Sequence, residues 1–422
     1  MTQQGAEERG GYGGPGDAAT VRSVNEMTAR WAQLAAPGGS GGGSGGQREG
    51  AGTVFTAAGL WPLLAGLAAG GDAQVRRELA GVLEVDPDRA ADLATGLMRL
   101  LNGIEGMDAA LGLWARASVE PEKDWVSALP YGTHGELTGA PQRDRERLDA
   151  WASEHTAGRI RSMPVVLEPA TLLVLASALV LNTTWEREFT AAPRMMTEYE
   201  PWMRRPRAQL SRAGTDLDEL DVADTAAGAV TRLTVRGDTG VDVQLLLGAP
   251  EMAPGAVLAA GARMPYSAPW IVPGSRLPFG TPGPGVSVAE TPSFDGTSVL
   301  SASLPPFTVE ARHDLLADAA EFGLATAAGR YDEGGHFPGI SRREPLAVGS
   351  AQQSVTATFS AKGFYAAAVT AVGMVRAAGL PPQRARSVAV RFDRPFGFVA
   401  VHRATGLILT AGWVTEPDPA QG

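Results

Sequence analysis

Five histidines are the side chains best suited to acid–base or metal chemistry in this sequence, and none stands at metal-ligand spacing from another ligand. They are His134, His155, His313, His336 and His402. A zinc site would need ligands scattered along the chain, and there is no cysteine to supply a thiolate or a disulfide. We therefore interpret the histidines as structural or surface residues and predict neither a metal nor a cofactor.

Two short segments match motifs of nucleotide binding or catalysis in form only. Residues 11–16, GYGGPG, fit the pattern G-x-G-x-x-G but follow no strand. Residues 42–46, GGSGG, fit the nucleophile elbow but lie in a Gly/Ser linker with no apolar strand before them. Because no catalytic constellation is left, the sequence predicts that the protein is not an enzyme.

Acidic residues are crowded in one polar stretch, which we interpret as a solvated loop. They are Asp216, Asp218, Glu219, Asp221 and Asp224. The whole chain carries a net charge of −10, which argues against nucleic acid and anionic membranes as partners. The N-terminus lacks the apolar core of a secretion signal, and no uncharged apolar run reaches the length of a membrane span. These features predict a cytoplasmic protein.

The pattern of apolar residues predicts an α+β fold with antiparallel sheets, with helices early in the chain and strands late. The expected helices are 21–34, 60–71, 73–83 and 145–160. Apolar and β-branched runs predict strands at 53–55, 170–185, 241–250, 354–361, 387–392 and 396–414. Residues 195–240 are polar and predicted to be irregular, and the Pro- and Gly-rich stretch 250–300 is left without assigned elements.

Six segments, in order along the chain, resemble motifs of the serpin family. The C-terminal segment 393–417 has a basic-Pro-Phe motif at 394–396, a Thr-Gly turn at 405–406 and a strand ending at Gly412 before Pro417. The other similar segments are 53–83, 148–160, 173–189, 304–315 and 337–341. Lysine occurs only at positions 123 and 362, which indicates a GC-rich genome. The chain thus resembles a serpin of bacterial, actinobacterial type.

This resemblance implies the serpin fold, in which helices pack on three mostly antiparallel β-sheets and a reactive-centre loop is exposed. It implies a single domain over 18–417, between a disordered tail at 1–17 and a short tail at 418–422. Within the domain we expect a flexible Gly/Ser loop at 37–52 and the reactive-centre loop at about 361–386. The resemblance also leaves an extracellular location open.

The segment 360–385 resembles the hinge and reactive-centre loop of serpins, in which the cleaved loop inserts as a strand into the main sheet. Because side chains alternate along a strand, the even-numbered residues of 364–372 share the face that becomes core, and none of them is charged. Gly363 is expected to form the bend where the loop leaves its strand. The expected hinge residues are Gly363, Phe364, Tyr365, Ala366, Ala367 and Ala368.

The resemblance also places the bond that the target protease cleaves. Family spacing puts it at Ala377-Ala378, with Arg376-Ala377 as the alternative. Alanine suits an elastase- or subtilisin-like serine protease, whereas arginine suits a trypsin-like one, whose pocket needs an acid. The implied function is inhibition of a serine endopeptidase as a suicide substrate, by a monomer, and hence negative regulation of proteolysis.

Two departures from the family pattern bear on this function. Phe364 and Tyr365 stand where serpins have a small hydroxyl residue and Glu, and a bulky ring is expected to slow insertion. A non-inhibitory serpin, used as a binding or storage module, and an unrecognised enzyme are therefore the alternative hypotheses. Beneath the sheet opening, where the family has polar residues, the matching positions are Thr56, Gly59, Ser177 and Gln353, with Trp185 at the end of the central strand.

Overall fold

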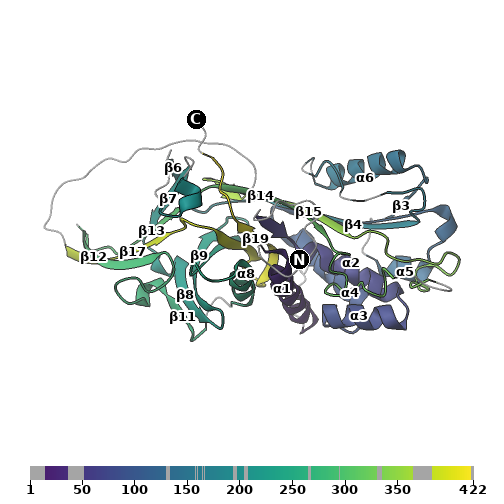
Figure 1. Ribbon diagram of the computed structural model, residues 1–422, viewed down its shortest axis with the longest axis horizontal. Coiled ribbons are helices and arrows are strands. Elements are labelled where there is room, and N and C mark those ends of the chain that lie inside the picture. Colours follow the sequence, from purple (N-terminus) through teal and green to yellow (C-terminus); the bar gives the residue numbers. More distant parts are fainter. Residues whose placement is uncertain are drawn as a thin grey trace, which may run out of the picture.

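The computed structural model describes residues 15–36, 52–129, 134–156, 158, 160–163, 165, 167–192, 197–203, 208–264, 268–293, 295–329, 335–364 and 383–419. It confirms the predicted α+β class, because helices cover the faces of mostly antiparallel sheets (Figure 1). Within these ranges no helix is both long enough and apolar enough to cross a membrane.

Most helices lie in the first half of the chain, as the apolar periodicity predicts. Helix α3 coincides with the expected 73–83, and α2 begins three residues before the expected position. Thr56 caps α2, since its Oγ1 accepts a hydrogen bond from the backbone N–H of Gly59 at 3.1 Å. The helices are α1 (Pro15–Ala35), α2 (Ala57–Gly70), α3 (Ala73–Leu83), α4 (Ala90–Gly103), α5 (Lys123–Ala128), α6 (Pro141–His155), α7 (Glu200–Met203) and α8 (Pro254–Arg263).

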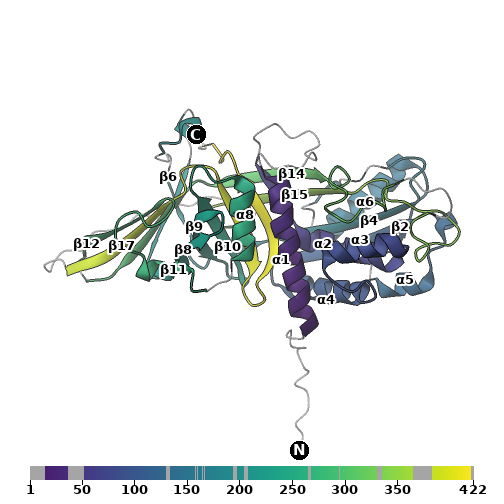
Figure 2. The same cartoon turned by 60° about the horizontal axis from the view of Figure 1, so that its bottom comes forward.

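The largest sheet has seven strands, and all neighbouring strands in it are antiparallel. Helices α1 and α8 lie side by side across one face of it (Figure 2). We call it the seven-stranded sheet. In spatial order its strands are β1 (Thr53–Phe55), β19 (Leu407–Val414), β18 (Phe396–His402), β10 (Val241–Gly248), β9 (Gly228–Arg236), β8 (Leu220–Thr225) and β11 (Ile271–Pro273).

A second sheet has five strands and is antiparallel except where β13 runs parallel to β17. The chain enters this sheet at the end of the expected reactive-centre loop, because β17 starts at Gln383. Its strands, in spatial order, are β12 (Val286–Ser293), β17 (Gln383–Arg391), β13 (Val299–Leu304), β7 (Gln209–Gly214) and β6 (Thr190–Ala192).

The remaining strands form two groups that we together call the split sheet. Three sheets were expected, whereas the described strands form four, because β4 and β15 are not hydrogen-bonded to each other. Helix α6 lies on one side of the split sheet, and α2 and α4 lie on the other (Figure 1). One group is β14 (Phe307–Asp314), β15 (Gln352–Phe359), β16 (Gly363–Phe364) and β5 (Thr183–Thr184), and the other is β3 (His134–Glu136), β2 (Met107–Ala115) and β4 (Leu173–Leu181).

The polar stretch 195–240 was predicted to be irregular, but it contains the strands β7, β8 and β9. Its acidic residues are not all solvated either, since Glu219 and Asp221 are buried. Arg212 Nη2 lies 3.1 Å from Glu219 Oε2, and Arg232 Nη2 lies 2.8 Å from Asp221 Oδ2. Opposite charges thus neutralise each other inside the fold, and a pattern based on the polarity of the sequence alone does not show this pairing.

Both ends of the domain extend beyond the expected boundaries. Helix α1 begins at Pro15, inside the segment 1–17 that was expected to be a disordered tail. Near the C-terminus, Asp418 belongs to the expected tail, yet its Oδ1 accepts a hydrogen bond from Thr308 N on β14 at 2.9 Å. The expected Gly/Ser loop 37–52 lies outside the described residues except for Gly52.

Candidate functional site

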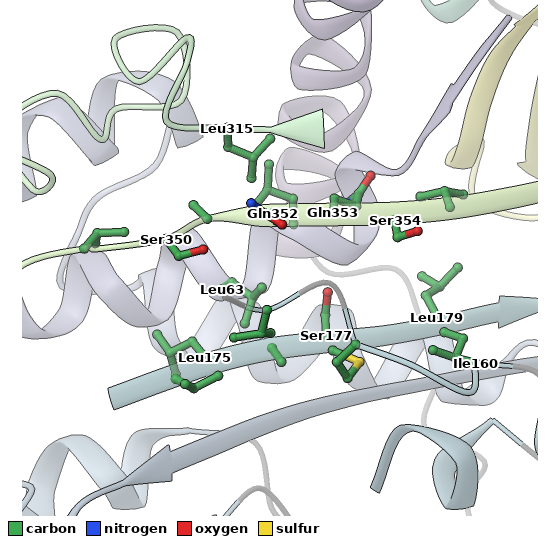
Figure 3. A pocket seen from close by; sticks show the side chains of 18 of the residues that line it. Leu63, Ile160, Leu175, Ser177, Leu179, Leu315, Ser350, Gln352, Gln353 and Ser354 are labelled. Carbon is green, nitrogen blue, oxygen red and sulfur yellow. The ribbon is translucent and has the colours of Figure 1, made fainter. Parts of the chain in front are cut away.

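A large cavity lies between β4 and β15, in the middle of the split sheet (Figure 3). Its volume is about 1250 Å³, and we call it the opening. Its floor is the apolar helix α2, and its sides are the facing edges of the two strands. The residues that α2 contributes are all leucines: Leu60, Leu63, Leu64 and Leu67.

The alternation of side chains along β4 determines which of them face the opening. Its even-numbered residues are buried, and Val174 and Ala176 pack in a cluster with Leu148 of α6. Its odd-numbered residues are only half-buried, and Ser177 and Leu179 line the opening. Half-buried apolar side chains on an unpaired strand edge are poorly packed, so the opening is an unfilled part of the core.

One end of the opening is closed by the first residues of the expected hinge. Phe364 pairs with Phe359 of β15 and with Thr183 of β5, so β16 lies between those two strands. Its ring is only 4% exposed and contacts the ring of Phe398 edge-on, with 5.8 Å between centroids. We expected Phe364 to be the first side chain to enter the sheet and to hinder insertion. The ring is in the core already, so its bulk is no longer an obstacle to burial.

The turn before the hinge is fixed to the end of the split sheet by Trp185 and Phe189. Trp185 Nε1 donates to Ser360 O at 3.0 Å, and the backbone N–H of Trp185 donates to Lys362 O at 2.9 Å. Phe189 N–H donates to Ala361 O at 2.8 Å. The bend therefore lies at residues 360–362, before Gly363, which is itself paired in β16 rather than forming the bend as expected.

Thr56 and Gln353, two of the expected positions, are joined by two hydrogen bonds. Gln353 Oε1 accepts from Thr56 N–H at 2.9 Å, and Gln353 Nε2 donates to Thr56 O at 2.9 Å. Thr56 Oγ1 also donates to Leu409 O in β19 at 2.7 Å. The amide of Gln353 thus imitates a strand neighbour and ties β15 to the start of α2 and to the seven-stranded sheet.

Ser177 lies on the other side of the opening from Gln353 (Figure 3). It comes close to Gly59, because a Cβ added to that glycine would lie 3.6 Å from Ser177 Oγ. Of the four expected positions, Ser177 and Gln353 line the opening, and Thr56 is joined by hydrogen bonds to Gln353 and to Gly59, whereas none of these bonds reaches Ser177.

His313, which we interpreted from the sequence as a structural or surface residue, is buried next to Gln353 in this region. It is the register partner of Gln353 on β14, and its Nε2 lies 3.0 Å from Val54 O. Its ring also contacts Trp31 edge-on at 5.3 Å between centroids. Burial lowers the pKa of His313. The position of His313 in the sequence gave no sign that it lies beside Gln353, because that neighbourhood depends on the pairing of β14 with β15.

Several expected site residues lie outside the described residues. They are the hinge residues Tyr365, Ala366, Ala367 and Ala368 and the residues of the expected scissile bond, Arg376, Ala377 and Ala378. Among the residues that are described, no group of three or more His, Cys, Asp or Glu side chains could hold a metal ion.

Comparison with known proteins gives one family. A family model described as serpin (serine protease inhibitor) matches residues 46–205 and 291–417, which is more than half of the chain. The protein serpin-Z12 of Oryza sativa subsp. japonica is 26% identical over 384 residues, covering 84% of this chain and 82% of its own. This relative is a plant protein, so it gives no support to the expected bacterial, actinobacterial type.

Solved structures share the fold at low sequence identity. Tengpin, a thermophilic serpin in its native state, matches with a TM-score of 0.69 and 14% identity over 97% of this chain and 96% of its own. Serpin48 of the insect Tenebrio molitor matches with a TM-score of 0.68 and 17% identity over 96% of this chain and 100% of its own. Thyroxine-binding globulin in complex with thyroxine matches with a TM-score of 0.67 and 15% identity, over 94% and 99%.

Proposed function

The chain belongs to the serpin family of serine protease inhibitors, and from that premise we propose that it acts as a suicide substrate, by inserting the cleaved segment after Phe364 into the opening. The observation that carries the proposal is the pairing of Gly363 and Phe364. They form a strand between β15 and β5 at one end of the opening. The chain therefore enters the split sheet at the point where an additional strand would begin.

The pairing of β16 sets the register that an extended strand would have. Phe364 lies opposite Phe359 on one side and opposite Thr183 on the other. Antiparallel ladders continue with the partner number falling as the strand number rises. Taken in steps of two, this register gives three sets of neighbours in the opening: Ala366 between Ala357 and Leu181, Ala368 between Val355 and Leu179, and Thr370 between Gln353 and Ser177.

This register matches the chemistry of the opening. Alanines would enter where leucines line it, and the hydroxyl of Thr370 would enter beside the polar side chains of Ser177 and Gln353. No charged side chain would be desolvated before Arg376. The new strand would also pair with the two strand edges that border the opening, which are not paired with each other. We infer that these contacts supply the driving force for insertion.

In the proposed reaction the serine of the protease attacks the carbonyl carbon of Ala377. The bond to the nitrogen of Ala378 breaks, and that nitrogen leaves as an amine after taking a proton from the histidine of the protease. The protease is then held as an ester at Ala377, and insertion carries this ester away before water hydrolyses it. If the bond is Arg376-Ala377, the same steps apply to a trypsin-like protease.

A panel of serine proteases of different pocket types tests the proposal. An elastase- or subtilisin-like enzyme is expected to form a complex that survives denaturing electrophoresis, and the released peptide is expected to begin at Ala378. A released peptide beginning at Ala377 would assign the target to the trypsin-like class. Cleavage outside 374–380 would contradict the register of the reactive bond, and the absence of any covalent complex across the panel would contradict inhibition by trapping.

A non-inhibitory binding or storage module is the second candidate. The similar fold of thyroxine-binding globulin, solved with thyroxine, supports it at the level of the family. The two candidates differ in the outcome of cleavage, because a module that never inserts its loop gains no pairing in the opening. Cleavage without a complex and without a rise in melting temperature would favour the module.

Three further proposals concern the location, the origin and the oligomeric state. We propose a cytoplasmic location, with an extracellular location as the alternative that the family suggests. The bacterial, actinobacterial origin follows from the use of arginine in place of lysine. The monomeric state follows from the proposed mechanism, which needs one chain and one protease.

A further inference from the structure

The outer parts of β12 and β17 form a two-stranded ribbon at one end of the molecule (Figure 1, Figure 2). Strand β13 pairs with β17 only from Ser387 onward, so residues 383–386 of β17 pair with residues 290–293 of β12 alone. We call these two paired stretches the ribbon end. The family model leaves residues 206–290 unmatched, and most of β12 lies there. The family pattern therefore does not account for this ribbon.

One face of the ribbon passes from the core into solvent. On β17, Val388 is buried, Arg386 is half-buried and Arg384 is exposed. The same change occurs on β12, where Val288 is buried and Glu290 is exposed. These residues share one face, because side chains two apart on a strand point to the same side and the two pairs lie in register. At the ribbon end this face is therefore open to a partner.

Two arginines and one carboxylate lie on this open face. Arg384 Nη1 is 2.9 Å from Glu290 Oε2, and the side chain of Arg384 is 84% exposed. The guanidinium of Arg386 lies over the ring of Phe279, 5.1 Å from its centroid, and its Nε and Nη2 have no hydrogen-bond partner among the described residues. The ring of Phe279 is 58% exposed. The face thus combines a surplus positive charge with an exposed aromatic ring, in a chain whose net charge is −10.

The outer edge of β12 is closed to a further strand. Val288 N–H donates to Gly280 O at 2.8 Å, and Gly280 N–H donates to Val288 O at 2.9 Å. Val286 N–H donates to Gly283 O at 3.1 Å. Farther along the same edge, Pro292 has no N–H to offer. A partner would therefore contact the side chains of the ribbon end rather than add a strand to it.

The place of the ribbon end along the chain indicates which partner reaches it. Only residues 378–382 separate the expected scissile bond from Gln383, where β17 begins. This stretch spans at most about 18 Å when fully extended. A folded protease of about 230 residues has a radius of gyration of about 17 Å, so its body extends farther than that from its active site. The ribbon end is therefore within reach of the protease surface next to the bound loop.

We propose that Phe279, Arg384 and Arg386 form a second contact for the protease that cleaves the loop, and that this contact selects proteases with an acidic surface beside the part of the cleft that binds the residues after the scissile bond. A carboxylate of the protease would pair with the guanidinium groups, and Phe279 would pack against its surface. The inference rests on the proposed function for the bond that is cleaved, but not on the insertion that follows cleavage.

The test measures the second-order rate constant with which a protease consumes the intact chain, whether by cleavage or by trapping. Two proteases with the same pocket type are compared, one with an acidic surface and one with a basic surface. Arg384→Glu is expected to slow the acidic protease about tenfold at low salt, because charges at the rim of an interface act mainly on the association rate. The difference is expected to shrink at about 1 M salt, where the Debye length is about 3 Å.

Arg391→Glu is the matched control. It makes the same change of charge on an exposed residue at the other end of β17, and it is expected to leave the rate constants of both proteases unchanged. With the basic protease, Arg384→Glu is expected to react at least as fast as the unaltered chain. Phe279→Thr is expected to slow the acidic protease equally at low and high salt, because the contact that it removes is apolar.

The outcomes separate the second contact from the function on which it rests. Equal rate constants for Arg384→Glu and Arg391→Glu with the acidic protease would overturn the second contact and leave trapping standing. A slower reaction of Arg384→Glu without any covalent complex would support the contact and contradict trapping. If no protease cleaves within 365–382, both fail. Should Arg384→Glu not fold, Arg384→Ala tests the same contact, with a smaller expected loss and the same contradicting result.

Discussion

The seven-stranded sheet and the split sheet differ in how completely their strands are paired. In the first, β10 and β19 are each paired on both sides and buried along their whole length. In the second, β4 and β15 flank a cavity of about 1250 Å³, and the side chains of β4 that face it are only half-buried. The seven-stranded sheet is therefore completely packed, whereas the split sheet leaves part of its core unfilled.

One short segment connects the two regions. Val54 and Thr56 flank Phe55 at the end of β1, the edge strand of the seven-stranded sheet, and they bond to His313 and Gln353 of the split sheet. The position of β14 and β15 is therefore set by the complete sheet. If the proposed insertion takes place, we expect the split sheet to move and this segment to stay fixed, and variants in each can be used to test the distinction.

The largest effect is expected from a charge at an inward-facing position of the inserting strand. Ala368→Arg is predicted to abolish trapping of the protease while cleavage continues, because burying the unpaired guanidinium costs several kcal/mol. The measurement is the number of inhibitor molecules consumed per protease inactivated. Ala367→Arg is the control, since its side chain would point outward, and it should trap the protease more efficiently than Ala368→Arg does. Equal trapping by Ala368→Arg and the unaltered chain would contradict insertion in this register.

Phe364→Thr is predicted to lower the free energy of unfolding of the intact protein by about 3 kcal/mol. The ring is buried against Phe398, so its removal leaves a cavity in the folded state. Denaturant unfolding measures the change. Phe279→Thr is the control, because that ring is 58% exposed, and it should cost less than about 1 kcal/mol. A stability unchanged by Phe364→Thr would place this ring outside the core.

Gln353→Ala is predicted to destabilise the intact protein by about 2 kcal/mol, because it leaves the N–H and C=O of Thr56 without their partner. The neighbouring Gln352 is exposed, so Gln352→Ala serves as the control and should have little effect. Equal stabilities of the two variants in urea would show that the tether between β15 and α2 contributes nothing.

The smallest effect concerns pH. Burial lowers the pKa of His313, so below pH 6.5 the unfolded chain takes up a proton that the folded chain does not. Stability is thus fully present above pH 6.5 and falls as the pH drops toward the lowered pKa, by at most about 1.4 kcal/mol per pH unit. Burial shifts the pKa of His402 in the same direction. His313→Gln should therefore reduce, without removing, the loss of stability between pH 6.5 and 5, and an unaltered slope would contradict this account.

The elements that the sequence predicted well are those with a regular apolar pattern. The predicted limits of α3 hold at both ends, since Asp72 caps the helix and its buried residues recur along one face. Strand β1 was also predicted within its limits. Strands β8 and β9 were missed because the buried pair of Arg232 and Asp221 adds to their polar composition, and the pairing partner of a charge is not visible in a local pattern.

The sequence predicted individual residues of the candidate site, but it did not predict how they are arranged. Motif similarity identified Thr56, Ser177, Trp185 and Gln353. Of these, Ser177 and Gln353 line the opening, Thr56 bonds to Gln353, and Trp185 bonds to Ser360 in the turn before the hinge. That β4 and β15 stay apart could not be predicted, because each strand alone has an ordinary pattern. The burial of Phe364 depends on Phe398, which is adjacent only after the sheets have packed.

The melting temperature before and after cleavage within 365–382 tests the central claim most directly. If the segment after Phe364 fills the opening, the cleaved protein will melt well above the intact protein, and cleaved Ala368→Arg will not. Equal melting temperatures for intact and cleaved forms of the unaltered chain would contradict the claim that the opening receives this segment.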